Sequence, residues 1–240
     1  MGDPEPTRQR VNDLLRRHRS NDGVVGALEG LCRAMSEDLA LLGAVVTLMP
    51  GIGAQAISAA SSPAARKVEE AQFDVGEGPT RDAFAARRPV LVADLEVAGV
   101  RRWPAWAPAA LASGVGAVYA FPLHIGASIF GVLTAFVGSG PRLEARGLET
   151  ALVFSESATE LLLDGFAPVD DHELERSLDA VLGTNGYIYQ AQGKVMVELG
   201  VSLPEALARM RAQAFATGQD LAALARDILD GRTMPTRDPR

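Results

Sequence analysis

Histidine and cysteine build many catalytic and metal-binding sites, and this chain contains few of them. His18, His124 and His172 lie far apart in the sequence, and no clear acid or nucleophile partner accompanies them. Cys32 is the single cysteine, so it can form neither an intramolecular disulfide nor a cysteine metal cluster. Sequence motifs of phosphate-binding loops, zinc proteases and serine hydrolases are absent. The sequence therefore predicts a protein that is not an enzyme, with no catalytic residues, no metal and no cofactor.

The overall composition narrows the class of protein further. A chain of 240 residues forms one large or two modest domains, and 48% hydrophobic with 22% charged residues is close to a soluble globular average. The formal charge of −7 argues against binding duplex DNA through a broad basic surface. The N-terminus has no apolar segment behind its charges and is not a signal peptide, so a cytoplasmic location is expected.

One long segment without Asp, Glu, Lys or Arg, residues 103–141, has to be distinguished from a membrane span. Prolines and glycines interrupt it, whereas a spanning helix needs about 20 mostly apolar residues with few breakers. Residues 115–123 alternate with a period of two, and a second apolar run follows at 128–137. Two buried strands explain this segment better, and no membrane partner is expected.

The remaining patterns predict the elements around these strands. Residues 1–20 read as a flexible tail, and a helix with an apolar stripe that includes a buried Cys32 begins near Asp22. A glycine-rich turn leads into a short helix that Pro79 or Thr80 would start. The order helix, two strands, helix, strand, helix, two strands, helix predicts an α+β domain over residues 21–166, with an antiparallel sheet and flanking helices. The expected strands are 43–49, 55–60 and 89–95, besides the two above, and the last helix starts at Pro141.

The C-terminal part has no strand signal and reads as an all-α unit of three helices over residues 167–233, followed by a disordered tail at 234–240. Its first helix is long and coiled-coil-like, with Asn185 and Gln192 as polar residues in an apolar seam. A capping box at 202–205 starts the second helix. The seam predicts a parallel homodimer, and its apolar positions are Leu174, Leu178, Val181, Ile188, Val195 and Leu199.

Two segments resemble known families. FDVGEGPTRDAFAARRPVLVADL (73–95) and GVGAVYAFPLHIGASIFGVLTAFV (114–137) are similar to a GAF domain, which is a sensory module that binds small molecules over its sheet or only dimerises. The motif of cyclic-nucleotide-binding members and a bilin-attachment cysteine are both absent. The resemblance implies a ligand pocket, and the aromatic residues in the covering loops and strands would line it: Phe73, Phe84, Trp103, Trp106, Tyr119 and Phe121.

The segment IYQAQGKVMVELGVSLPEALARMRAQAF (188–215), with DLAALARDIL (220–229), resembles an ANTAR domain, the RNA-binding output module of transcription antiterminators. Members act as dimers on paired stem-loops of nascent transcripts. Small residues would allow close approach, while amide and basic side chains would contact bases and phosphates. The resemblance implies these RNA-binding residues: Gln190, Ala191, Gln192, Gly193, Lys194, Arg209 and Arg211.

Two functions remain open on the sequence alone. The first is a regulator of transcription antitermination, in which the GAF domain senses a signal and an ANTAR dimer binds RNA. The second is a signalling or scaffold protein whose ANTAR helices only dimerise. Eight basic and 11 acidic residues follow Pro168, so RNA affinity would depend on local clustering. The two hypotheses differ in whether Gln192, Lys194, Arg209 and Arg211 share one exposed face.

Overall fold

The sheet of the N-terminal domain has five antiparallel strands in the order β2-β1-β5-β4-β3. A computed structural model describes residues 4–18, 20, 23–51, 54–126, 128–165 and 186–236. Within these ranges the α+β class predicted for this domain is confirmed. The strands are β1 Gly43–Gly51, β2 Ala54–Ala60, β3 Val90–Val92, β4 Ala117–Ile125 and β5 Ser128–Val137.

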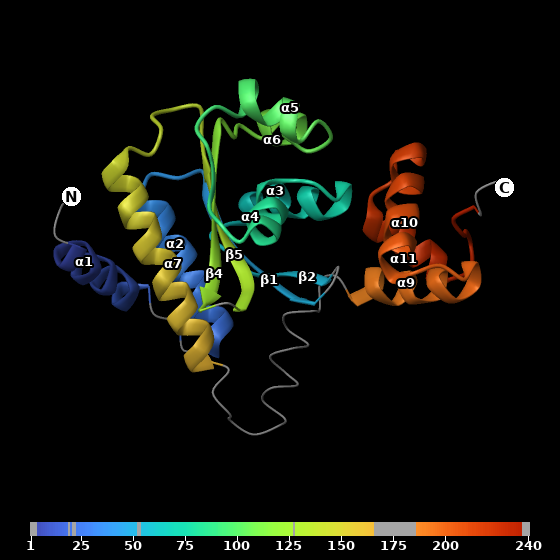
Figure 1. Cartoon of the computed structure of the whole chain (residues 1–240), viewed down its shortest axis with the longest axis horizontal. Helices are drawn as coiled ribbons and strands as arrows, with labels where there is room; N and C mark the ends of the chain where they lie inside the picture. Colours follow the sequence, from blue (N-terminus) through green and yellow to red (C-terminus); the bar gives the residue numbers. More distant parts are fainter. Residues whose placement is uncertain are drawn as a thin grey trace.

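Helices cover both faces of the sheet (Figure 1). One face carries α2 (Gly23–Asp38) and α7 (Ala145–Gly165), with α1 (Pro4–Arg17) against α7. The other face carries α3 (Pro63–Val75) and α4 (Pro79–Ala86). A π-helical turn and two short helices follow β3 beside that face: Leu95–Gly99, α5 Val100–Arg102 and α6 Ala107–Ala112.

The prediction of a flexible tail over residues 1–20 is wrong, because residues 4–17 form α1. Val11 is fully buried in the core under α2 and α7, with Leu14 packed beside it. Arg10 donates a hydrogen bond to Thr150 Oγ1 at 3.0 Å, and Arg8 pairs with Glu156 on α7. The polar residues seen in the sequence are thus the outer face of an amphipathic helix.

Alternation along the strands creates two separate cores. On β4, Tyr119 and Phe121 pack toward α2 and α7, whereas Val118 and Ala120 pack toward α3 and α4. Cys32 lies in the first core, where burial raises the pKa of its thiol to about 12, so this cysteine is a small apolar side chain at neutral pH. A ligand bound over one face of the sheet would therefore contact only one of these two sets of side chains.

The charge-free segment forms β4 and β5, and within the described ranges no helix is long and apolar enough to cross a bilayer. The strand predicted for 89–95 is shorter than expected. It ends at Val92 because the Asp94 side chain accepts a hydrogen bond from Val97 N at 3.0 Å and begins a helical turn. The last helix of this domain, α7, begins at Ala145, four residues after the predicted start at Pro141.

The described part of the C-terminal unit contains α9 (Gly186–Leu199), α10 (Leu203–Thr217) and α11 (Leu221–Leu229). Ser202 and Asp220 cap the last two helices by accepting hydrogen bonds from the backbone amides of Glu205 and Ala223. Met234, in the predicted disordered tail, packs against the core of this unit. Residues 166–185 lie outside the described part of the chain, and with them Leu174, Leu178 and Val181 of the predicted seam.

The rest of the seam packs within its own chain. Ile188 and Val195 on α9 are buried with Leu207 of α10 and Leu224 of α11. Because these residues form the core of a three-helix unit, this half of the seam is not free to pair with a second copy. The prediction of a dimer seam over 188–199 is corrected accordingly.

Candidate functional site

The structure does not bring the six predicted pocket residues together. Trp103, Trp106 and Phe84 lie on the α3–α4 face of the sheet, whereas Tyr119 and Phe121 lie on the α2–α7 face. Phe73 belongs to neither set, because its ring packs into the core of the C-terminal helices. Tyr119 and Phe121 are two residues apart and share one face of β4 as expected, but that face is opposite the one that carries the tryptophans.

On the α3–α4 face, aromatic rings occupy the space where a pocket was expected. Trp103 and Trp106 are buried and meet edge to face with their centroids 5.6 Å apart. Trp106 also approaches Phe136 of β5 at 6.4 Å, and its indole Nε1 donates to Val68 O at 3.1 Å. The indoles therefore join α6 to α3 as a packed lid.

A buried carboxyl group lies over the same face, and the sequence reading missed it. Glu69 on α3 is fully buried and accepts hydrogen bonds from Thr47 Oγ1 at 2.9 Å, Gln72 Nε2 at 2.6 Å and Thr80 Oγ1 at 3.0 Å. Thr80 Oγ1 also lies 2.8 Å from Thr134 Oγ1. This cluster joins α3 and α4 to strands β1 and β5. Only the spacing of Glu69 and Gln72, one helical turn apart, hinted at it in the sequence.

The environment of Glu69 favours its protonated form. Burial raises the pKa of this carboxyl group from 4.5 to about 7, although hydrogen bonds from Thr47 and Thr80 lower it. This carboxyl group therefore takes up a proton at a higher pH than an exposed glutamate does.

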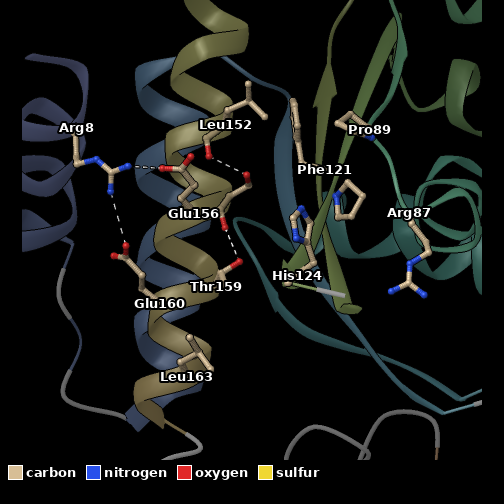
Figure 2. Close-up of a pocket in the computed structure, with 13 residues that line it drawn as sticks. Arg8, Arg87, Pro89, Phe121, His124, Leu152, Glu156, Thr159, Glu160 and Leu163 are labelled. Carbon is tan, nitrogen blue, oxygen red and sulfur yellow. Dashed lines mark hydrogen bonds and ion pairs between the residues drawn. The ribbon is translucent and has the colours of Figure 1, made fainter. Parts of the chain in front are cut away.

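A groove of about 580 Å³ lies on the opposite face, between α7 and the end of β4. Figure 2 shows Phe121 and His124 on β4 beside α7, with Leu152 and Leu163 along that helix. The two leucines are 44% and 47% exposed. Of the predicted pocket residues, only Phe121 lines this groove, so it is a different site from the expected one.

The predicted RNA-binding residues are also dispersed. Ala191 is fully buried, and Gln192 is buried with its Nε2 donating to Leu203 O at 2.7 Å. Both thus lie in the core of the three-helix unit. Gln190 is exposed, and a Cβ at Gly193 would meet no atom within 4 Å. These two residues remain on the surface of α9.

The three predicted cations are all engaged within the protein. Lys194 Nζ donates to Ile228 O at 2.8 Å, and Arg209 pairs with Glu205 one turn earlier. The Arg211 guanidinium donates to Phe73 O, on α3 of the N-terminal domain. Gln192, Lys194, Arg209 and Arg211 therefore do not share one exposed face. By the criterion set on the sequence this outcome favours the scaffold function, and an RNA surface on these helices would have to consist of other residues.

Lys194 supports the fold of the C-terminal unit, since its ammonium caps the last carbonyl groups of α11. We expect Lys194→Ala to lower the free energy of unfolding by about 1 kcal/mol, the size typical of a lost helix cap. Urea denaturation would measure this loss, with Lys67→Ala on an exposed position of α3 as the control. An unchanged midpoint would show that this capping contact contributes nothing to stability.

The outward side of α9 presents an exposed stripe, defined here as Gln190, Gly193 and Val197. These positions are three and four residues apart and lie opposite the buried Ile188, Ala191 and Val195. Val197 is 73% exposed. The stripe thus combines an amide, a site of close approach and an apolar side chain.

Beside the exposed stripe lies a pair that sequence reasoning did not single out. Tyr187 is 53% exposed, and the Arg226 guanidinium of α11 lies over its ring at 5.9 Å. An exposed aromatic ring with a cation beside it can stack on an unpaired base and contact its phosphate. The tyrosine was visible in the sequence, but only the packing of α11 on α9 brings Arg226 to it.

Comparisons with known proteins agree with this architecture. A family model described as GAF domain matches residues 23–162, and one described as ANTAR domain matches residues 176–229. None of the curated proteins matches this chain.

Two solved structures show the fold of the N-terminal domain. One is a GAF domain from a Coxiella burnetii phosphoenolpyruvate-protein phosphotransferase, 12% identical with a TM-score of 0.53, covering 68% of this chain and 96% of that one. The other is a GAF domain from an Acinetobacter phosphoenolpyruvate-protein phosphotransferase, 10% identical with a TM-score of 0.51, covering 70% and 98%. With its sheet, its two helical layers and a family match over more than half of its length, the chain belongs to the GAF domain family and carries an ANTAR domain after the GAF domain.

Proposed function

We propose that this protein is an RNA-binding regulator of transcription antitermination, whose GAF domain receives a signal and whose ANTAR helices bind stem-loops in nascent RNA. The observation that carries the proposal is the exposed stripe of α9, flanked by the Tyr187–Arg226 pair. Sequence-specific RNA recognition targets unpaired loop bases through stacking and hydrogen bonds, which such a surface supplies without a large positive charge.

The regulator acts as a homodimer in this proposal. The groove side of α7 leaves Leu152 and Leu163 half exposed, and the chain continues from the end of α7 toward Leu174 and Leu178 of the predicted seam. A second copy packed along α7 and this continuation would place two ANTAR units together. Each ANTAR unit of the dimer could then bind one of the two paired stem-loops.

The signal is a small molecule or another change of conditions that acts on the GAF domain. We place its action at the Glu69 cluster between α3, α4 and the sheet, because the groove beside α7 lies on the face assigned above to the second copy. We propose no catalytic role for the Glu69 cluster or for the groove. In this proposal the protein acts in the cytoplasm, where nascent RNA is accessible.

Replacing Gly193 should test the RNA surface without disturbing the fold. A Cβ at this position meets no neighbouring atom, and leucine is a better helix former than glycine. We expect Gly193→Leu to weaken binding to an RNA with two adjacent stem-loops by about 100-fold, because the added side chain blocks close approach. Fluorescence anisotropy at two salt concentrations would measure it.

Ala208→Leu provides the matched control, since Ala208 is exposed on the outward side of α10. This control should bind RNA as the wild type does, and thermal melts should show that both variants are folded. If Gly193→Leu binds the RNA as tightly as the wild type does, the exposed stripe is not part of the RNA interface. No binding by the wild type would favour the scaffold function.

A further inference from the structure

The GAF domain holds the ANTAR helices through one of its own aromatic side chains. Phe73, near the end of α3, is 2% exposed and packs in the ANTAR core with Ile188 and Met210. Its ring meets the Tyr189 ring edge to face, with centroids 6.2 Å apart. Because Phe73 belongs to neither core of the sheet, its burial depends on the ANTAR helices lying where they do.

A tyrosine hydroxyl fixes the same helices to the edge of the sheet. Tyr189 OH accepts a hydrogen bond from Gln55 N at 2.5 Å and donates one to Gln55 O at 2.6 Å. Strand β2 is an edge strand, so its outward backbone groups have no neighbouring strand to pair with. The hydroxyl of α9 satisfies both groups of one residue there.

Arg211 makes a third connection, at the C-terminal end of α3. Its Nε and Nη2 donate to Phe73 O at 2.9 and 2.7 Å, and its guanidinium lies 5.2 Å from the centre of the Phe73 ring. The last carbonyl groups of a helix lack partners within the helix and carry partial negative charge. The arginine therefore caps α3 from the other domain.

We propose that these contacts of Gln55 and Phe73 with Tyr189 and Arg211, called here the docking contact, are autoinhibitory: the GAF domain competes with RNA for the ANTAR helices. The inference rests on the proposed RNA-binding function. Tyr189 lies one turn before Gly193, at the border of the exposed stripe, and Arg211 is one of the cations that the ANTAR resemblance assigns to RNA. In the docked arrangement the GAF domain holds both side chains, while the exposed stripe itself stays open, so the competition is for the border of the RNA surface.

The docking contact also gives the sensor a route to its output. Gln55 Nε2 lies 3.5 Å from Glu69 Oε1, and Gln72, which precedes Phe73 on α3, donates to Glu69 Oε2 at 2.6 Å. A change that rearranges this cluster shifts the same helix and strand that hold Tyr189 and Arg211. The signal would then release the ANTAR helices by moving their support.

Breaking the docking contact should tighten RNA binding, because apparent affinity rises with the fraction of molecules in the binding-competent state. Phe73→Ala alters only the GAF side and removes no group from the RNA surface. Tyr189→Phe keeps the ring and removes both hydrogen bonds to Gln55. We expect each variant of the full chain to bind the RNA with two stem-loops about tenfold more tightly than the wild type. Lys67→Ala, on the exposed side of α3, should bind as the wild type does.

Hydrogen exchange of the Gln55 amide reports the docking contact independently of affinity. Exchange should be slow in the wild type, and faster in Tyr189→Phe or after the RNA is added. Equal RNA affinities for all four proteins would overturn autoinhibition while leaving RNA binding intact. A Gln55 amide exchange rate that stays the same after RNA is added would also overturn autoinhibition. If neither the wild type nor the released variants bind RNA, the proposed function fails and the inference fails with it.

Discussion

Trp106→Ala should lower the free energy of unfolding by about 4 kcal/mol, which is the usual cost of removing a fully buried tryptophan. The side chain is fully buried between Trp103 and Phe136, and its indole Nε1 satisfies Val68 O. Its removal leaves a cavity and takes away the hydrogen bond that joins the indole to α3. Urea denaturation followed by circular dichroism would measure the loss.

The same variant tests whether the tryptophan lid occupies a ligand site. An apolar cavity of this kind binds small aromatic molecules, so millimolar indole should raise the melting temperature of Trp106→Ala and leave the wild type unchanged. Phe215→Ala is the control, since Phe215 is 83% exposed and its loss should change stability by less than about 0.5 kcal/mol. A loss below about 1 kcal/mol for Trp106→Ala would contradict the packing described here.

Glu69→Gln should remove much of the pH dependence of stability between pH 4.5 and 7. Burial raises the pKa of Glu69 to about 7 in the folded protein, whereas the unfolded chain releases this proton near pH 4.5. The folded state therefore binds the proton more tightly, and the stability it adds is complete below pH 4.5 and lost as the pH rises to 7. At about 1.4 kcal/mol per pKa unit, the loss is about 3 kcal/mol.

Denaturation of both proteins from pH 4.5 to 8 tests this expectation. The advantage of Glu69→Gln over the wild type should grow by about 3 kcal/mol across the range. Asp74, whose pKa burial raises to about 6, acts in the same direction in both proteins and cancels in the difference. A difference that stays constant with pH would show that the pKa of Glu69 is the same in the folded and the unfolded protein.

The GAF fold was predictable because its signals are local. Alternation along 115–123 and the Pro-Thr start of α4 depend on neighbouring residues only, and both appear as predicted. The Glu69 cluster depends instead on Thr47, Thr80 and Thr134, which the fold brings together from distant positions. No local pattern identifies such partners, and α1 was missed for the same reason: Val11 is buried by α2 and α7.

The ANTAR site illustrates the same limit. The sequence predicted two roles for Gln192, one as a polar residue in the apolar seam and one as an RNA-binding residue. Because Gln192 is buried, only the first role fits the structure. Lys194 and Arg211 were expected to be available as cations, yet each meets carbonyl groups at a helix end that is remote in sequence. The exposure of Gln190 and the open space beside Gly193 were likewise decided by the packing of α10 and α11 against α9.

The most direct test of the account is ultraviolet crosslinking of RNA to this protein in living cells, with sequencing of the RNA and mass spectrometry of the crosslinked peptides. The account predicts transcripts with adjacent stem-loops, and crosslinks concentrated between Tyr187 and Val197 of α9. No RNA above the level of an uncrosslinked sample, or crosslinks confined to the GAF domain, would contradict it.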